Sequence, residues 1–117
     1  MRKAICVEGK EFAGMKTLAM KGAIWIHDND TKIPIVVGTM REPKICGYAR
    51  ELQRDVESGE VTMDFFIHPS FEVNLDEFDA TVTLTDIMSA KGKDDDELTI
   101  INSGRLREVR LVWEKKP

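Results

Sequence analysis

Hydrophobic and polar positions alternate along much of this chain, which is the pattern of strands that bury one face. The clearest alternation covers residues 61–67, where Val61, Met63 and Phe65 are separated by polar residues. A second covers residues 80–85, where three apolar residues alternate with three threonines. Because β-branched polar residues are favoured on the outer face of a sheet, both segments predict β-strands.

A turn signal precedes the first of these strands. Asp55 and Ser58 can bond to nearby backbone amides, and Gly59 takes a positive φ without steric cost, as a short hairpin loop requires. Residues 45–56 then form the partner strand of a hairpin. The same stretch also carries apolar positions at helical spacing, so a helix over residues 43–57 in an α+β fold is the alternative.

The first third of the chain predicts three more strands, at residues 3–8, 17–27 and 33–37. Pro34 lacks an amide hydrogen, which places the last of these at a sheet edge or turns its N–H side to solvent. In the long middle segment, four apolar positions share one face: Leu18, Met20, Ile24 and Ile26.

The last third begins with residues 68–79, whose proline and scattered acids predict a connection with one helical turn. Residues 98–100 are expected to pair with residues 109–113 across a turn at residues 102–104. The alternation of the final strand slips near Arg107, as a β-bulge would make it.

These segments make seven or eight short strands with at most one short helix. Turn signals between short strands are typical of β-sandwiches and small barrels, so we predict a mainly β fold of that kind. A chain of 117 residues with 42% hydrophobic residues suits one core, and residues 1–117 are expected to form a single domain. The predicted core contains Ile24, Ile26, Ile35, Val37, Met63, Phe65, Val82, Leu84, Leu111 and Trp113.

The formal net charge of −4 is unevenly distributed. Residues 70–100 carry nine acids and two bases, whereas residues 101–117 carry five bases and two acids. Because binding to nucleic acid depends on neutralising phosphates, we expect an acidic chain like this to have no nucleic-acid partner. The N-terminus lacks a signal-peptide core and no long apolar run occurs, so we expect a cytoplasmic protein without membrane contact.

The chemical inventory is small. Cys6, His27, Cys46 and His68 lack the close spacing of metal-ligand pairs, so we predict no metal site and no disulfide. Neither the GxSxG elbow of a nucleophilic serine nor a glycine-rich phosphate loop is present. We therefore expect no catalytic residues, no cofactor and no enzymatic activity.

Two candidate binding sites remain. Trp25, Tyr48 and Phe66 are aromatic residues out of register with the predicted core faces, which makes them candidates for the lining of a ligand pocket. The C-terminal strand appears apolar on both faces around Val112, so another subunit is expected to cover one of them. Three arginines of this strand are expected to meet the acidic segment of that subunit: Arg105, Arg107 and Arg110.

The segment GYARELQRDVESGEVTM and the later segment FEVNLDEFDATVTLTDI together resemble the small β-rich structural and accessory proteins of tailed phages. The resemblance covers a strand, a turn, a strand and a further alternating segment. It implies self-assembly or docking on a host protein rather than turnover of a substrate. We therefore expect a non-catalytic interaction or structural protein, and the alternative is a small-ligand binder with a pocket in a barrel or at a subunit interface.

Overall fold

The computed structural model describes residues 1–12, 15–38, 41–93 and 97–113, without the side chain of Trp113. It confirms the predicted mainly β fold, since the described ranges contain eight strands and one 3₁₀ turn. The elements are β1 (Arg2–Val7), β2 (Thr17–Ala19), β3 (Ile24–Trp25), β4 (Ile33–Val37), β5 (Lys44–Arg54), β6 (Glu60–Ile67), η1 (Leu75–Glu77), β7 (Phe78–Lys91) and β8 (Thr99–Trp113). β7 and β8 are longer than expected, with 14 and 15 residues.

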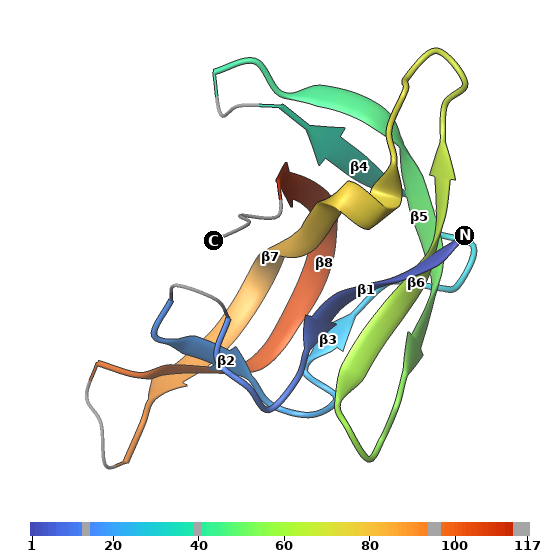
Figure 1. The fold of residues 1–117 in the computed structure, drawn as a ribbon. Helices are drawn as coiled ribbons and strands as arrows, with labels where there is room; N and C mark the ends of the chain where they lie inside the picture. Colours follow the sequence, from blue (N-terminus) through green and yellow to red (C-terminus); the bar gives the residue numbers. More distant parts are fainter. Residues whose placement is uncertain (13–14, 39–40, 94–96, 114–117) are drawn as a thin grey trace.

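All eight strands belong to one sheet, which curls into a half-barrel (Figure 1). Neighbouring strands follow the order β1, β6, β5, β4, β8. β7 pairs antiparallel with β8 along nearly its whole length, so β2, β3 and β4 share the other edge of β8. These three strands run parallel to β8 and pair with it in succession, at residues 99–101, 104–105 and 109–110. Within the described residues, β1 and β7 each pair along one edge only, with β6 and β8, and the short strands β2 and β3 pair only with β8.

Alternate residues of the curled strands form the hydrophobic core. Five of the predicted core residues are buried: Ile24, Ile35, Met63, Phe65 and Leu111. Four others are half-buried and pack against that core: Ile26, Val37, Val82 and Leu84. The core position predicted for the side chain of Trp113 lies outside the described part of the structure.

The predicted hairpin is confirmed, and the alternative helix over residues 43–57 is wrong because β5 occupies that stretch and pairs with β6. The loop has the expected chemistry. The Asp55 carboxylate accepts hydrogen bonds from the backbone amides of Glu57 (2.9 Å) and Ser58 (3.3 Å), and Gly59 has a φ of 79°. These local bonds set where the chain reverses.

The single strand predicted over residues 17–27 is wrong. β2 and β3 are separate short strands, and a turn between them contains Gly22 at a φ of 85°. Because this turn resets the register, Ala19 is buried while Met20 is 50% exposed rather than facing inward.

The edge position predicted for the strand at Pro34 is also wrong, because β4 lies between β5 and β8. Pro34 faces Tyr48 across the ladder with β5, whereas the ladder with β8 begins one residue later, at Ile35. Pro34 therefore lies before the first residue of β4 that pairs with β8, so that ladder does not need the amide hydrogen that proline lacks.

The turn predicted at residues 102–104 does not form, because β8 runs through it as one strand and β7 is its antiparallel partner. A Cβ at Gly104 would lie 2.9 Å from Cδ1 of Leu84, so the glycine serves close packing rather than chain reversal. The predicted bulge is confirmed. Thr83 faces Glu108 but Leu84 faces Leu106, which leaves Arg107 as the extra residue.

Two smaller features complete the fold. The connection from β6 to β7 contains the expected helical turn, η1, where the Asn74 side chain accepts from the Asp76 amide at 3.2 Å. The buried Glu8 carboxylate accepts from the amides of Gly22 and Ile24, each at 3.0 Å, and pairs with Arg54. Glu8 thereby ties the end of β1 to β3 and β5.

Candidate functional site

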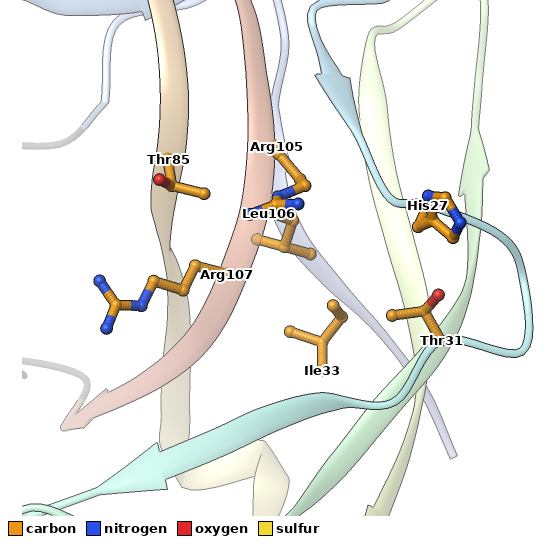
Figure 2. Close-up of a pocket in the computed structure, with 7 residues that line it drawn as sticks. All are labelled: His27, Thr31, Ile33, Thr85, Arg105, Leu106 and Arg107. Atoms are coloured by element: carbon orange, nitrogen blue, oxygen red, sulfur yellow. The ribbon is translucent and has the colours of Figure 1, made fainter.

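One pocket opens between the loop after β3 and the β7–β8 hairpin, with a volume of about 350 Å³ (Figure 2). Its lining comes from β7, β8, the start of β4 and the loop that precedes it: His27, Thr31, Ile33, Thr85, Arg105, Leu106 and Arg107. Arg105 and Arg107 are its two cationic side chains.

Two polar side chains of this pocket already contact carboxylates of the same chain. Arg105 lies 3.4 Å from the carboxylate of Asp86, and the Thr31 hydroxyl donates to Asp28 at 3.2 Å. Figure 2 shows the Arg107 side chain extending away from His27, on the other side of β8. The cationic groups therefore do not converge on one ligand atom.

A second site lies on the face of the sheet opposite the core, where Tyr48 of β5 and Phe66 of β6 are register partners. Their rings stack with centroids 5.0 Å apart and an interplanar angle of 21°. The Lys32 Nζ lies 4.8 Å from the centroid of Tyr48, and the Arg50 Cζ lies 5.0 Å from that of Phe66. We call these four side chains the aromatic cluster, since each cation lies over one ring as cation–π pairs do.

An apolar pocket of about 560 Å³ adjoins the two rings, and we call it the aromatic pocket. Gly47 lines it and allows β5 and β6 to approach closely, because a Cβ there would lie 2.0 Å from the backbone oxygen of Phe66. The lining comes from the start of β5, the end of β6 and the following loop: Ile45, Cys46, Gly47, Tyr48, Phe66, Ile67, His68, Pro69, Ser70 and Phe71.

A serine and a histidine meet at the rim of this pocket. The Ser70 hydroxyl lies 2.7 Å from His68 Nδ1, and the Ser70 amide donates to the same nitrogen at 3.1 Å. The backbone amide is an obligatory donor, so Nδ1 accepts and the neutral ring carries its proton on Nε2. The pair lies in the turn after β6, where both contacts of Ser70 reach the same ring nitrogen.

A third concave surface follows the free edge of β7, and we call it the β7 groove. Asp79 to Val82 all line its first part, and because consecutive strand residues point to opposite faces, the cavity lies along the strand edge. Its two parts, of about 450 and 330 Å³, share Phe12, Met15, Thr81 and Val82. The two parts therefore adjoin each other, and β1 flanks the first of them.

The residues predicted for a subunit interface are not gathered on one free surface. Two of the arginines have partners in the same chain, since Arg105 pairs with Asp86 and Arg110 lies 3.4 Å from Glu108. Arg105 and Asp86 belong to the paired strands β8 and β7, whereas Arg110 and Glu108 both lie on β8. Val112 is 41% exposed and lines the β7 groove.

The aromatic residues predicted for a ligand pocket are only partly brought together. Tyr48 and Phe66 share the aromatic pocket, but Trp25 lies on β3 and donates from its indole to the Ser103 hydroxyl at 3.2 Å. Sequence reasoning missed Lys32 and Arg50. Arg50 lies two residues after Tyr48 and so points to the same face of β5, which is a signal that the sequence contains.

Neither cysteine has the environment of a reactive thiol or a ligand. Burial, and next the negative charge of Glu8, raise the pKa of the Cys6 thiol to about 12, and burial also raises the pKa of Cys46. Both thiols stay protonated at neutral pH. Within the described residues, no three His, Cys, Asp or Glu side chains gather as a metal-ligand set.

The described ranges contain no helix with the length and apolar character needed to cross a bilayer. No family model, curated protein sequence or solved structure matches the chain.

Proposed function

We propose that this chain is a non-catalytic structural protein that self-associates through the β7 groove. The observation that carries this proposal is a row of exposed apolar side chains along the groove: Met15 is 56% exposed, Ile87 is 50% exposed and Val112 is 41% exposed. Fully burying a side chain of this size is worth about 1.5–3 kcal/mol, so a partner that covers all three has a substantial driving force.

The occupant of the groove is a second copy of the chain, on grounds of charge. β7 contains three charged residues, and Asp86 is paired with Arg105. The other two, Asp79 and Lys91, have opposite signs and lie at opposite ends of the strand. Two copies related by a twofold axis, with their β7 strands antiparallel, therefore place Asp79 of each copy beside Lys91 of the other.

Apolar contact rather than backbone pairing supplies the energy of this interface. Asp86 has a φ of 53°, and the register of β7 shifts between Thr85 and Met88. A bulge of this kind interrupts the row of backbone donors and acceptors on the free edge, as is common where edge strands are protected from random pairing. The charges at the two ends then select the antiparallel orientation.

The test is the molar mass in solution, measured by size-exclusion chromatography with light scattering between about 1 and 100 μM. We expect a dimer whose fraction rises with concentration, and Ile87→Asp should make it monomeric without lowering its melting temperature. Val56 is 79% exposed in the β5–β6 loop, away from the groove, so Val56→Asp is the matched control and should leave the dimer intact.

Charge reversal tests the orientation. Asp79→Lys and Lys91→Asp should each weaken the dimer by roughly tenfold, and the double variant should restore it, because both ion pairs are re-formed with reversed sign. A wild type that stays monomeric at about 100 μM would refute the proposal. An oligomer unaffected by Ile87→Asp would place the interface elsewhere on the chain.

A further inference from the structure

We propose that the aromatic pocket binds a small molecule with a flat apolar body and one anionic group. This site lies on the outer face of β5 and β6, whereas the groove assigned to self-association follows β7. Ligand binding and oligomerisation are therefore independent properties.

The flat apolar body follows from the lining of the pocket. Its volume of about 560 Å³ falls within the range of small-molecule sites, which are mostly apolar with few polar groups. Tyr48, Phe66 and Phe71 supply three rings, and aromatic partners prefer offset or edge-to-face contact with such rings. A planar ring system uses these contacts better than a flexible alkyl chain does.

The anionic group follows from the charges around the pocket. None of its lining residues is acidic, and the rings of Tyr48 and Phe66 each carry a cation, Lys32 and Arg50. The Nε of Arg50 is buried and has no acceptor among the described residues. Because that nitrogen is buried and neither Lys32 nor Arg50 lines the pocket, the two side chains favour an anion there through their charge rather than through a direct hydrogen bond.

His68 supplies a further donor at the rim. Because the Ser70 amide holds Nδ1 as an acceptor, the proton of the neutral ring lies on Nε2. A carboxylate oxygen that accepts from Nε2 would lie at the rim of the pocket. The two cations over the neighbouring rings and the Nε2 donor of His68 favour a carboxylate over an amine or an uncharged ligand.

The site is largely formed in the free protein. Tyr48 and Phe66 are held opposite each other by the ladder between β5 and β6, and Gly47 allows the two backbones to approach closely. Side chains fixed by regular strands lose little conformational freedom on binding, which favours affinity for a small ligand.

Three probes of the same shape and different charge test the assignment: 1-naphthoate, 1-naphthalenemethanol and 1-naphthylmethylamine. Amide shifts in two-dimensional NMR spectra of the ¹⁵N-labelled protein give both affinity and location. We expect 1-naphthoate to bind most tightly and to shift the amides of Ile45, Gly47, Ile67 and Phe71. Absence of saturable shifts up to about 2 mM, or equal binding of all three probes, would overturn the proposal.

Variants separate the apolar and the charged parts of the site. Tyr48→Ala should weaken 1-naphthoate by about tenfold, since an aromatic pair and its buried area are lost. Arg50→Gln should weaken 1-naphthoate by about fivefold but leave 1-naphthalenemethanol unchanged, because only the charge is removed. Trp25→Ala is the matched aromatic control and should change neither affinity.

Two outcomes assign the surface differently. An acidic peptide with an aromatic residue that binds here more tightly than 1-naphthoate would make it a protein-docking site and overturn the small-molecule assignment. Shifts confined to the β7 groove would overturn it as well. The wild-type spectra decide both outcomes even if Tyr48→Ala fails to fold.

Discussion

Replacing Glu8 with Gln tests the buried ion pair that joins three strands. The carboxylate has two oxygens that accept from the amides of Gly22 and Ile24 and from Arg54. A glutamine has the same length but only one acceptor oxygen, and its amide hydrogens must point at one of these donors. At least one buried donor is then left without an acceptor, and Arg54 loses its counter-charge.

The expected cost is about 3 kcal/mol. An unsatisfied buried donor costs about 1–3 kcal/mol, and breaking a buried ion pair costs about 3–5 kcal/mol. We take the lower end of the ion-pair range because the Arg54 side chain is 26% exposed and partly screened by solvent, although Glu8 is fully buried. A loss of this size lowers the melting temperature of a domain of this length by about 10 °C.

Urea unfolding followed by far-UV circular dichroism measures the free energy of unfolding. Glu57 lies in the exposed β5–β6 loop, so Glu57→Gln is the matched control and should change stability by less than about 0.5 kcal/mol. Arg54→Met should also destabilise the protein, and the double variant should lose less than the sum of the single losses. A loss below about 1 kcal/mol for Glu8→Gln would refute the idea that this carboxylate ties β1 to β3 and β5.

Three further predictions concern single residues. Burial and the nearby charge of Glu8 raise the pKa of Cys6 to about 12, so a thiol reagent at pH 8 should label Cys6 in unfolded protein but not in native protein. Backbone N–H groups of the following loop lower the pKa of Asp55 below its ordinary value of 3.8, so its contribution to stability is present above pH 3.8 and is lost as the pH falls through the lowered pKa. The gap in melting temperature between wild type and Asp55→Asn should therefore close on acidification, and a constant gap would contradict this assignment. Gly47→Ala should cost about 2 kcal/mol or more in chemical unfolding, because its Cβ would lie 2.0 Å from the Phe66 oxygen and the strands must separate.

The elements that sequence analysis placed correctly are those whose signals are local. The β5–β6 hairpin is determined by Asp55, Ser58 and Gly59, whose hydrogen bonds and positive φ lie within the loop itself. The bulge at Arg107 was visible because alternation slips over adjacent residues. Both features needed no knowledge of distant neighbours.

The errors concern residues whose roles depend on distant strands. Gly104 was taken as a turn residue, whereas it makes room for Leu84 of β7. Pro34 predicted either an edge position or an N–H side turned to solvent, because the sequence does not show that the β8 ladder begins only after it. In both cases the sequence shows the residue type, but the structural role of the residue depends on a strand that is distant in the sequence.

The aromatic cluster shows the same contrast between local signals and distant partners. Loss of register singled out Tyr48 and Phe66, which the structure stacks, but it also singled out Trp25, which pairs with a different strand. Lys32 was missed because its place over Tyr48 requires β4 to lie beside β5. An aromatic residue can be found from its strand pattern, whereas its cation can be found only from the strand order.

The parallel pairing of β2 and β3 with β8 also bears on how the protein is made. Ala19 pairs with Ile101, and Ile24 pairs with Gly104. β2 and β3 therefore have no strand partner until the last strand, β8, has been synthesised. At ordinary rates of translation this delay lasts about 4 to 16 seconds, during which their apolar side chains remain uncovered. The β5–β6 hairpin and β4 can form meanwhile from neighbouring segments. The second and third strands to be synthesised are thus separated from their pairing partner by most of the remaining chain.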